Sequence, residues 1–184
     1  MNAHLVFIDE SGLLMAPLLR RTWAPRGKTP ILYQKTRSHK KVSMIAALTL
    51  APIRARIGLY FSLHSNANIA SPQIARFLQL LAAHLQKPLL ILWDRLRAHR
   101  SQNIRRLLRR RRHLHMDFFP PYAPELNPVE SFWGYLKGNP LANRAPTDIQ
   151  HLSRTARYHA RQIRRHPALL RSFLYATPLF LRQK

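Results

Sequence analysis

The segment from residue 114 to residue 137 constrains the fold more than any other part of this 184-residue chain. Its first residues, Leu114–Phe118, alternate apolar and polar side chains, which predicts a strand. Prolines at 120, 121 and 124 then exclude both a sheet ladder and a helix. Asn127 suits a helix N-cap and Pro128 the first helical position, so the pattern predicts a helix that presents Glu130 in its first turn.

Glu130 has two interpretations at this point. The Asn-x-x-Glu arrangement resembles a capping box, in which the glutamate bonds the backbone of Asn127 and only starts the helix. The alternative is a functional carboxylate, and the composition of the chain gives it weight. Only 7 acidic residues stand against 31 lysines and arginines, for a net charge of +24 and a pI near 11.9, so each carboxylate lies in a cationic surrounding.

This charge predicts a polyanionic partner, most simply nucleic acid. An anionic membrane is the competing partner, but no apolar run approaches the length of a spanning helix, and the N-terminus lacks the pattern of a signal peptide. We therefore expect a cytoplasmic protein without a membrane partner. The absence of cysteine excludes disulfides and thiolate metal sites, and the ten histidines show no ligand spacing.

Two further acids follow apolar runs. Leu5–Ile8 predicts a buried strand that ends in a turn at Asp9–Gly12, although an aspartate often only starts a turn. A helix opened by Ser71 and Pro72 leads to Leu89–Trp93, a buried strand that ends in Asp94. A helical crossover favours parallel pairing with an earlier strand, and ligands gather at the carboxyl ends of such strands.

The remaining elements are predicted from periodicity. Residues 42–50 and 57–63 are β-compatible runs that suggest an antiparallel meander with the first strand, and residues 31–33 give a short strand. We predict a helix that includes residues 104–108, another that follows a capping box at Thr147–Gln150, and a short one that follows Pro167.

Several basic residues are candidate phosphate contacts, although a run of charge is as often a solvated face. His99 is interpreted as a phosphate donor or a turn residue, in preference to a catalytic base. The candidates for DNA contact are Lys35, Arg37, Lys40, Arg95, His99, Arg105, Arg109 and Lys137.

Four motifs together carry a family resemblance. They are Phe7–Gly12, Trp23–Gly27, Leu92–Asp94 with His99, and Pro121–Glu130 with Trp133 and Lys137. With them the chain resembles the catalytic domain of the insertion-sequence 630 family of transposases, relatives of the Tc1/mariner elements in the DDE, RNase H-like group. The resemblance covers residues 5 to about 140, and the last motif is the most specific.

The resemblance implies an α/β fold of the RNase H-like kind, a mixed sheet flanked by helices. It implies a catalytic triad of Asp9, Asp94 and Glu130 that holds two Mg²⁺ ions, with Mn²⁺ as a substitute and Asp9 as the bridging ligand. Ordinary carboxyl pKa values, lowered further by the surrounding cations, would keep these ligands ionised. The implied activity is cleavage of DNA at element ends and strand transfer into target DNA, by a homodimer associated with the bacterial nucleoid.

Two features depart from the family pattern. Arg95 stands where the family commonly has asparagine, and a cation there can hold a phosphate. The chain starts eight residues before Asp9, so we expect one catalytic domain over 1–184, with a core at about 4–140 and a helical segment at about 147–184, and no N-terminal helix-turn-helix region. An upstream reading frame would then supply that region, or the chain is a truncated remnant.

The contrasting hypothesis is a catalytically inactive, basic DNA-binding remnant of a transposase, which would bind DNA with steep salt dependence and cut nothing. A structural RNA-associated protein is disfavoured, because such a protein gains nothing from acids at strand ends and at a helix start.

Overall fold

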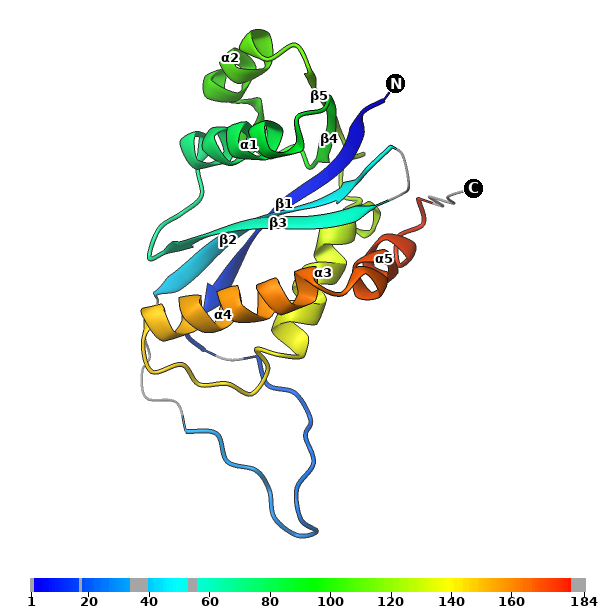
Figure 1. Ribbon diagram of the computed structural model, residues 1–184. Coiled ribbons are helices and arrows are strands. Elements are labelled where there is room, and N and C mark those ends of the chain that lie inside the picture. The colour runs from blue at the N-terminus through cyan, green and yellow to red at the C-terminus, as the bar shows by residue number, and fades with distance from the viewer. Residues whose placement is uncertain (1, 17, 34–39, 53–55, 180–184) are drawn as a thin grey trace.

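Five strands form one mixed sheet in the computed structural model, which describes residues 2–16, 18–33, 40–52 and 56–179. The strand order is β3-β2-β1-β4-β5 (Figure 1). The predicted meander is confirmed, because β1 pairs antiparallel with β2 and β2 with β3; the predicted parallel pairing is confirmed as well, because β4 lies parallel to both β1 and β5. The strands are β1 (His4–Leu14), β2 (Lys41–Leu50), β3 (Ile57–Ser65), β4 (Leu89–Trp93) and β5 (Leu114–Phe118).

The first strand is longer than its sequence indicates. The turn expected at Asp9–Gly12 does not form, and β1 continues through these residues to Leu14. Its register with β2 runs without a break from Leu5↔Leu50 to Leu14↔Lys41. The polar residues stay in the strand because β2 satisfies their backbone groups, which local composition does not reveal. Asp9 therefore lies in the middle of a central strand, opposite Ala46.

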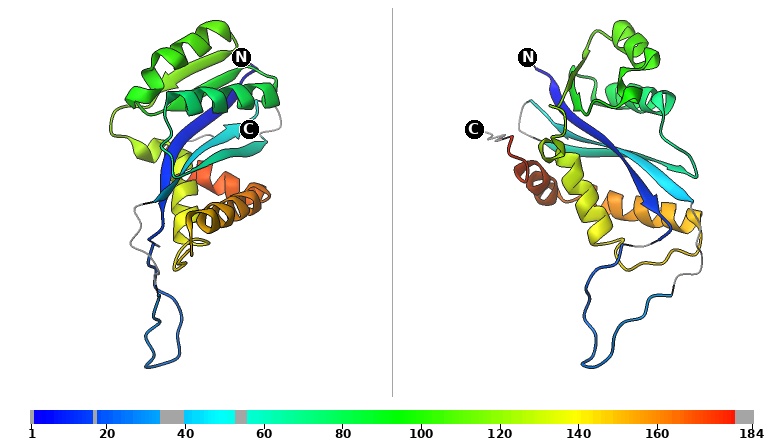
Figure 2. Two further views of the ribbon diagram at one scale, coloured as in Figure 1. Left: turned by 90° about the vertical axis from the view of Figure 1, so that its left-hand side faces the viewer. Right: turned by 180° about the vertical axis from the view of Figure 1, so that it is seen from behind.

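Helices cover both faces of the sheet (Figures 1 and 2). α1 (Ser71–Leu85) and α2 (Gln102–Arg110) pack on one face, while α3 (Pro128–Gly138), α4 (Ile149–Arg164) and α5 (Pro167–Tyr175) pack on the other. Two short 3₁₀ turns, η1 (Arg97–Arg100) and η2 (Pro124–Leu126), lie in the connections that follow β4 and β5.

Alternation along β1 divides the core between these faces. Val6 and Ile8 pack in the cluster beneath α1 and α2, whereas Phe7 and Leu13 pack in the cluster beneath α3, α4 and α5. All four side chains are less than 5% exposed. The sheet thus has two buried faces, and consecutive residues of β1 point to opposite sides of it.

Two predicted helix starts shift by one residue. Ala70, not Ser71, is the N-cap of α1, and its amide donates to the Gln73 side chain. Asp148 is the N-cap of α4 and accepts from the amide of His151, so the capping box expected at Thr147–Gln150 does not form. An aspartate one position later provides a stronger charge-assisted cap.

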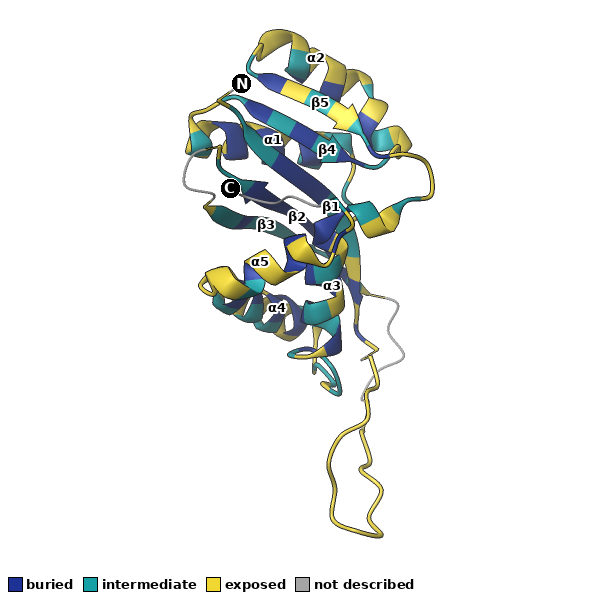
Figure 3. Ribbon diagram, turned by 90° about the vertical axis from the view of Figure 1, so that its right-hand side faces the viewer, coloured by how far each residue is buried: buried dark blue, intermediate teal, exposed yellow. Residues whose placement is uncertain are grey.

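Residues 18–33 extend away from the sheet as an exposed segment (Figure 3). The strand predicted at 31–33 is absent, because no strand within the described residues pairs with this segment. A turn closes at Gly27, whose φ of 79° suits glycine, and the amide of Lys28 donates to the carbonyl of Pro25. Among the described residues, none of the helices has the length and apolar character needed to cross a bilayer.

Candidate active site

One face of α3 lies against the middle of β1. Glu130, Trp133 and Lys137 follow the i, i+3, i+7 spacing that places them on a single side of the helix. Trp133 Nε1 donates to Asp9 Oδ2 at 2.8 Å, and Lys137 Nζ donates to Ser11 Oγ at 2.6 Å. Asp9 and Ser11 share one face of the strand. The helix start predicted at Pro128 is confirmed, and it brings Glu130 to the same side of the sheet as Asp9.

Asn127 connects the start of α3 to β1. Its Oδ1 accepts from the amide of Val129 at 3.2 Å, and its Nδ2 donates to the carbonyl of Ile8 at 3.0 Å. The backbone amide of Asn127 donates to Pro124 rather than to Glu130, so the Glu130 side chain does not close a capping box. The carboxylate of Glu130 is exposed and remains available for another role.

Replacing Asn127 with alanine is expected to lower the free energy of unfolding by about 1–3 kcal/mol, because the helix loses its cap and the buried carbonyl of Ile8 loses its donor. Asn127→Ser keeps a capping hydroxyl but is too short to reach Ile8, so we expect an intermediate loss. Urea unfolding of the three proteins measures the difference. Equal stabilities would show that this connection contributes nothing.

Asp9 carries an unusual charge state for an aspartate. Burial, followed by repulsion from Glu130, raises its pKa to about 7, although the hydrogen bond from Trp133 opposes the change. The expectation that surrounding cations lower the carboxyl pKa values is therefore wrong for Asp9. Most basic side chains in the described residues lie on the surface, whereas Asp9 lies beneath α3 with another carboxylate as its electrostatic neighbour.

The raised pKa of Asp9 predicts a pH-dependent stability in the absence of metal. Protonation of Asp9 stabilises the folded state fully below pH 3.8, and this contribution is lost as pH rises through about 7. Asn at this position stays neutral, so Asp9→Asn should melt a few degrees above the wild type at pH 8 in EDTA. The difference should shrink at pH 5, as calorimetry of both proteins can measure. Identical melting temperatures at pH 8 would contradict the repulsion.

Asp94 belongs to a second cluster, built around a buried histidine. His99 Nδ1 lies 2.8 Å from Asp94 Oδ1, and His99 Nε2 lies 3.2 Å from both carboxylate oxygens of Glu10. The imidazole is 1% exposed and stacks on Trp93, with ring centroids 4.0 Å apart. The prediction that His99 contacts a DNA phosphate is therefore wrong, because the ring is buried and both of its nitrogens have hydrogen-bond partners.

The charges of this cluster support one another. Burial lowers the pKa of His99, but hydrogen bonds to Asp94 and Glu10 outweigh it and raise the pKa to about 9. Burial raises the pKa of Asp94, yet hydrogen bonds from His99 and from the amide of Leu96 bring it below its ordinary value. At neutral pH the cluster thus contains a cationic imidazolium between two carboxylates.

The three predicted acids therefore lie in two groups. Asp9 and Glu130 are electrostatic neighbours beside α3, and Asp94 lies with Glu10 and His99. Within the described ranges, no three His, Asp or Glu side chains are gathered closely enough to hold a metal ion as they stand. The backbones are adjacent, since Phe7 and Leu92 pair in register and Asp9 and Asp94 each follow two residues later.

The chemistry of these donors fits a divalent cation. Asp9 and Glu130 are two neighbouring carboxylates, and burial, together with their mutual repulsion, raises the pKa of Asp9. Oxygen ligands of this kind suit Mg²⁺ or Mn²⁺, and a cation beside them would remove the repulsion. Asp94 Oδ2 accepts no hydrogen bond from any described residue, so the neighbouring strand offers a third oxygen.

The predicted DNA contacts occupy different surroundings. Arg105 and Arg109 are exposed on α2, and Lys40 is exposed just before β2. Arg95 is exposed while its Nε donates to the carbonyl of Phe119, and Lys137 is half-buried against Ser11. The remaining two candidates, Lys35 and Arg37, fall outside the described residues.

An apolar cavity of about 520 Å³ lies farther along the α3 face, beyond the carboxylates. Leu13, Leu141 and Leu152 contribute to its lining, and Lys137 and Arg144 bring positive charge to it. None of the predicted acids lines this cavity, so it is separate from the candidate active site.

Sequence reasoning named Glu10, Asn127 and Trp133 only within motifs or as a helix cap and assigned them no role at the site. Glu10 and Asn127 make contacts 89 and 119 positions away along the chain, and Trp133 reaches Asp9 across 124 positions. The available signal was the position of Glu10 directly after Asp9 in the sequence. Once the strand is known to continue through both residues, their side chains must lie on opposite faces of the sheet.

Comparison with known proteins identifies a family for this chain. The model of a family described as DDE superfamily endonuclease matches residues 4–153. No curated protein matches the chain significantly.

Solved structures of the Mos1 transposase share the fold. The Mos1 transposase paired-end complex with left transposon end matches with a TM-score of 0.68 and 15% identity, over 95% of this chain and 52% of that chain. The Mos1 strand transfer complex matches with a TM-score of 0.58 and 15% identity, over 97% of this chain and 56% of that chain. The catalytic domain of Mos1 mariner transposase matches with a TM-score of 0.53 and 13% identity, over 94% of this chain and 81% of that chain. The chain spans about half the length of the first two, and the RNase H-like fold prediction is confirmed.

Proposed function

Because the chain belongs to the DDE superfamily endonucleases, we propose that it is the catalytic domain of a transposase of the insertion-sequence 630 group, which cuts DNA at element ends and joins them to target DNA. The proposed catalytic residues are Asp9, Asp94 and Glu130. The observation that carries the proposal is the placement of Asp9 and Glu130 together on the α3 side of β1, with Asp94 at the end of the adjacent parallel strand.

Phosphodiester cleavage requires stabilisation of negative charge on the attacking and leaving oxygens. Divalent cations bound by Asp9, Glu130 and Asp94 would supply this stabilisation. The protein contributes carboxyl oxygen ligands at fixed backbone positions. Asn127 fixes the start of α3 relative to Ile8, and Trp133 orients Asp9 by donating to Oδ2, so one Asp9 oxygen is held while Oδ1 accepts no side-chain hydrogen bond from the described residues.

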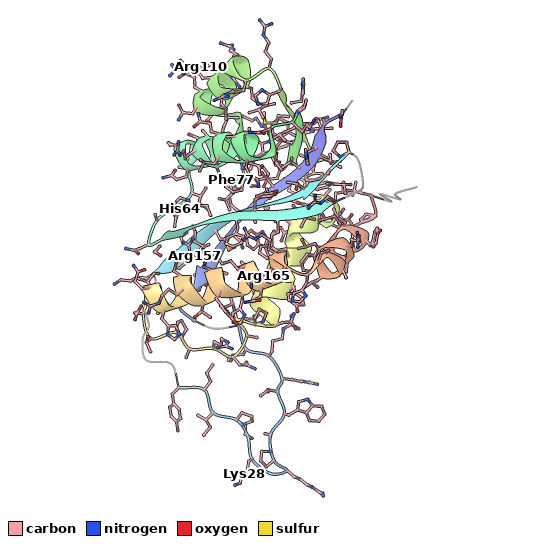
Figure 4. All side chains as sticks on the ribbon, in the orientation of Figure 1. Lys28, His64, Phe77, Arg110, Arg157 and Arg165 are labelled. Carbon is pink, nitrogen blue, oxygen red and sulfur yellow. The ribbon has the colours of Figure 1, made fainter. Side chains whose placement is uncertain are left out.

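The molecule also presents basic surfaces on both sides of the sheet. Arg110 on α2 and Arg157 on α4 are exposed and belong to helices that cover opposite faces of the sheet (Figure 4). Neither helix contains an acidic residue between its first and last positions, so these arginines have no neutralising partner on their own helix. Such surfaces attract the phosphates of a DNA duplex, and we propose the surface of α2 as the one in direct contact, through Arg105 and Arg109.

Incubation of the purified chain with duplex DNA tests the proposed activity. With Mg²⁺ or Mn²⁺ we expect nicked strands, and with EDTA none. DNA carrying the terminal repeats of the element should be cut at the repeat ends. A protein that binds DNA but cuts nothing with either cation would instead be an inactive DNA-binding remnant.

Loss of two α2 arginines is expected to reduce the salt dependence of DNA binding. Each phosphate contact contributes about 0.9 to the slope of log affinity against log salt, so Arg105→Gln with Arg109→Gln should lower the slope by about 2. Fluorescence titration at several salt concentrations measures it. Arg157→Gln with Arg161→Gln on α4 is the charge-matched comparison. An equal effect of both pairs would mean that net charge, rather than contact at α2, sets the affinity.

A further inference from the structure

We infer that Glu10 and His99 form a positioning pair that holds Asp94 ready to bind a divalent cation. This inference rests on the proposed function, since it assigns Asp94 to the metal. It gives a role to Glu10, an acid beside Asp9 that is not among the proposed ligands, and a role to His99 other than contact with DNA. Both residues act through Asp94 and are positioning residues rather than catalytic ones.

The direction of Glu10 separates it from the proposed ligands. Asp9 and Glu10 are consecutive in β1, so their side chains leave opposite faces of the sheet. Asp9 contacts Trp133 of α3, while Glu10 contacts His99, whose ring stacks on Trp93 in the cluster beneath α1 and α2. Glu10 is 15% exposed. Its carboxylate is directed into the protein on the side away from Asp9 and Glu130.

His99 is held by contacts with Glu10, Asp94 and Trp93. Both oxygens of Glu10 lie 3.2 Å from Nε2, and Asp94 Oδ1 lies 2.8 Å from Nδ1. Ionised carboxylates only accept hydrogen bonds, so each ring nitrogen donates. The ring planes of His99 and Trp93 lie within 5° of parallel. The indole of Trp93 stacks on His99 although its buried Nε1 has no hydrogen-bond partner among the described residues. A buried donor without a partner lowers the stability of the folded state.

The consequence for Asp94 is a carboxylate with one occupied and one open oxygen. Oδ1 accepts from His99 and from the amide of Leu96 at 3.0 Å, whereas Oδ2 accepts from no described residue. Asp94 lies at the end of a strand, where nothing in the sheet would otherwise fix its side chain, and it is 45% exposed. Glu10 and His99 thus connect the orientation of Asp94 to β1, the strand that carries Asp9.

Partners that orient a metal ligand typically change metal affinity by about 10- to 100-fold when removed. We therefore expect Glu10→Ala to raise the Mn²⁺ concentration for half-saturation by about this factor, measured by calorimetry without DNA. The Mn²⁺ concentration for half-maximal nicking should rise in parallel. Glu10→Gln still accepts from His99 and should recover part of the affinity, and His99→Gln should resemble Glu10→Ala. DNA affinity in EDTA should stay at the wild-type value.

Glu125 provides the matched control. It is an exposed glutamate in η2 that makes no hydrogen bond or ion pair to the cluster among the described residues, so Glu125→Ala removes the same charge elsewhere. An unchanged Mn²⁺ affinity in Glu10→Ala would overturn the inference. Reduced nicking with an unchanged metal dependence would also overturn it, since that indicates a general structural role. A loss in Glu10→Ala without any loss in His99→Gln would make Glu10 a ligand itself and would overturn the pair.

Failure of the proposed function gives a different result. In that case Asp94→Asn would leave Mn²⁺ binding unaltered, and the wild type would not nick DNA. If Asp94→Asn abolishes Mn²⁺-dependent nicking while Glu10→Ala and His99→Gln behave as the wild type, only the positioning role is lost.

Discussion

The Asp9→Asn variant is expected to lose metal-dependent DNA nicking, with a rate reduction of about 10³-fold or more. Asn is nearly isosteric with Asp and can still accept from Trp133 Nε1, so the fold and the α3 contact should be retained. It cannot supply an anionic oxygen to a cation. Single-turnover nicking of a labelled duplex in Mn²⁺, beside DNA affinity in EDTA, separates the chemical defect from a binding defect.

Two further variants sharpen this test. Glu130→Gln removes the other carboxylate of the pair. It should produce a loss of similar size, since Asp9 and Glu130 are electrostatic neighbours and both are proposed ligands of the cation. Asp117→Asn removes an aspartate that is exposed on β5 and should nick at the wild-type rate. An Asp9→Asn protein that still nicks at more than a tenth of the wild-type rate would exclude Asp9 from the chemistry.

The second large effect is expected in the core beneath α3. Phe132 is fully buried, and its ring centroid lies 4.8 Å from that of Trp133 and 6.3 Å from that of Phe173. Truncation to alanine removes buried apolar surface and leaves a cavity, which should lower the free energy of unfolding by about 3–5 kcal/mol. That is a large part of the 5–15 kcal/mol typical of a domain. Urea unfolding followed by circular dichroism measures it.

The position of Phe132 also links stability to the site. It is next to Trp133, which contacts Asp9, so loosening this packing should disturb the proposed catalytic carboxylates before the whole domain unfolds. Tyr175→Ala removes an aromatic side chain that is 62% exposed and should cost less than about 0.5 kcal/mol. A Phe132→Ala protein as stable as Tyr175→Ala would mean that α3 is not held by this aromatic cluster.

Local sequence signals predicted the elements whose ends are marked by proline or by a change in periodicity. Leu89–Trp93 and Leu114–Phe118 form strands with the expected bounds, and α3 begins at Pro128 after its Asn127 cap. These signals act over a few residues, through the missing amide of proline and the side-chain cap. They were sufficient to locate Glu130 at a helix start.

Signals of the same kind failed for β1 and for residues 31–33. Asp9–Gly12 has the composition of a turn but pairs with β2, and residues 31–33 have the composition of a strand but find no partner. Pairing depends on a partner strand more than 25 residues away, so local composition does not decide it. This error concealed the opposite directions of Asp9 and Glu10.

By itself, the sequence determined the basic character of the surface, the elements with strong local signals and the three acids that the family resemblance selects. Tertiary structure alone decided which side chains meet. It placed Asp9 with Glu130 under Trp133 and raised the pKa of Asp9 to about 7, and it placed Asp94 with Glu10 around a buried His99. The physical reason is that burial and electrostatic contact are set by distances in space, and these contacts join positions up to 124 residues apart.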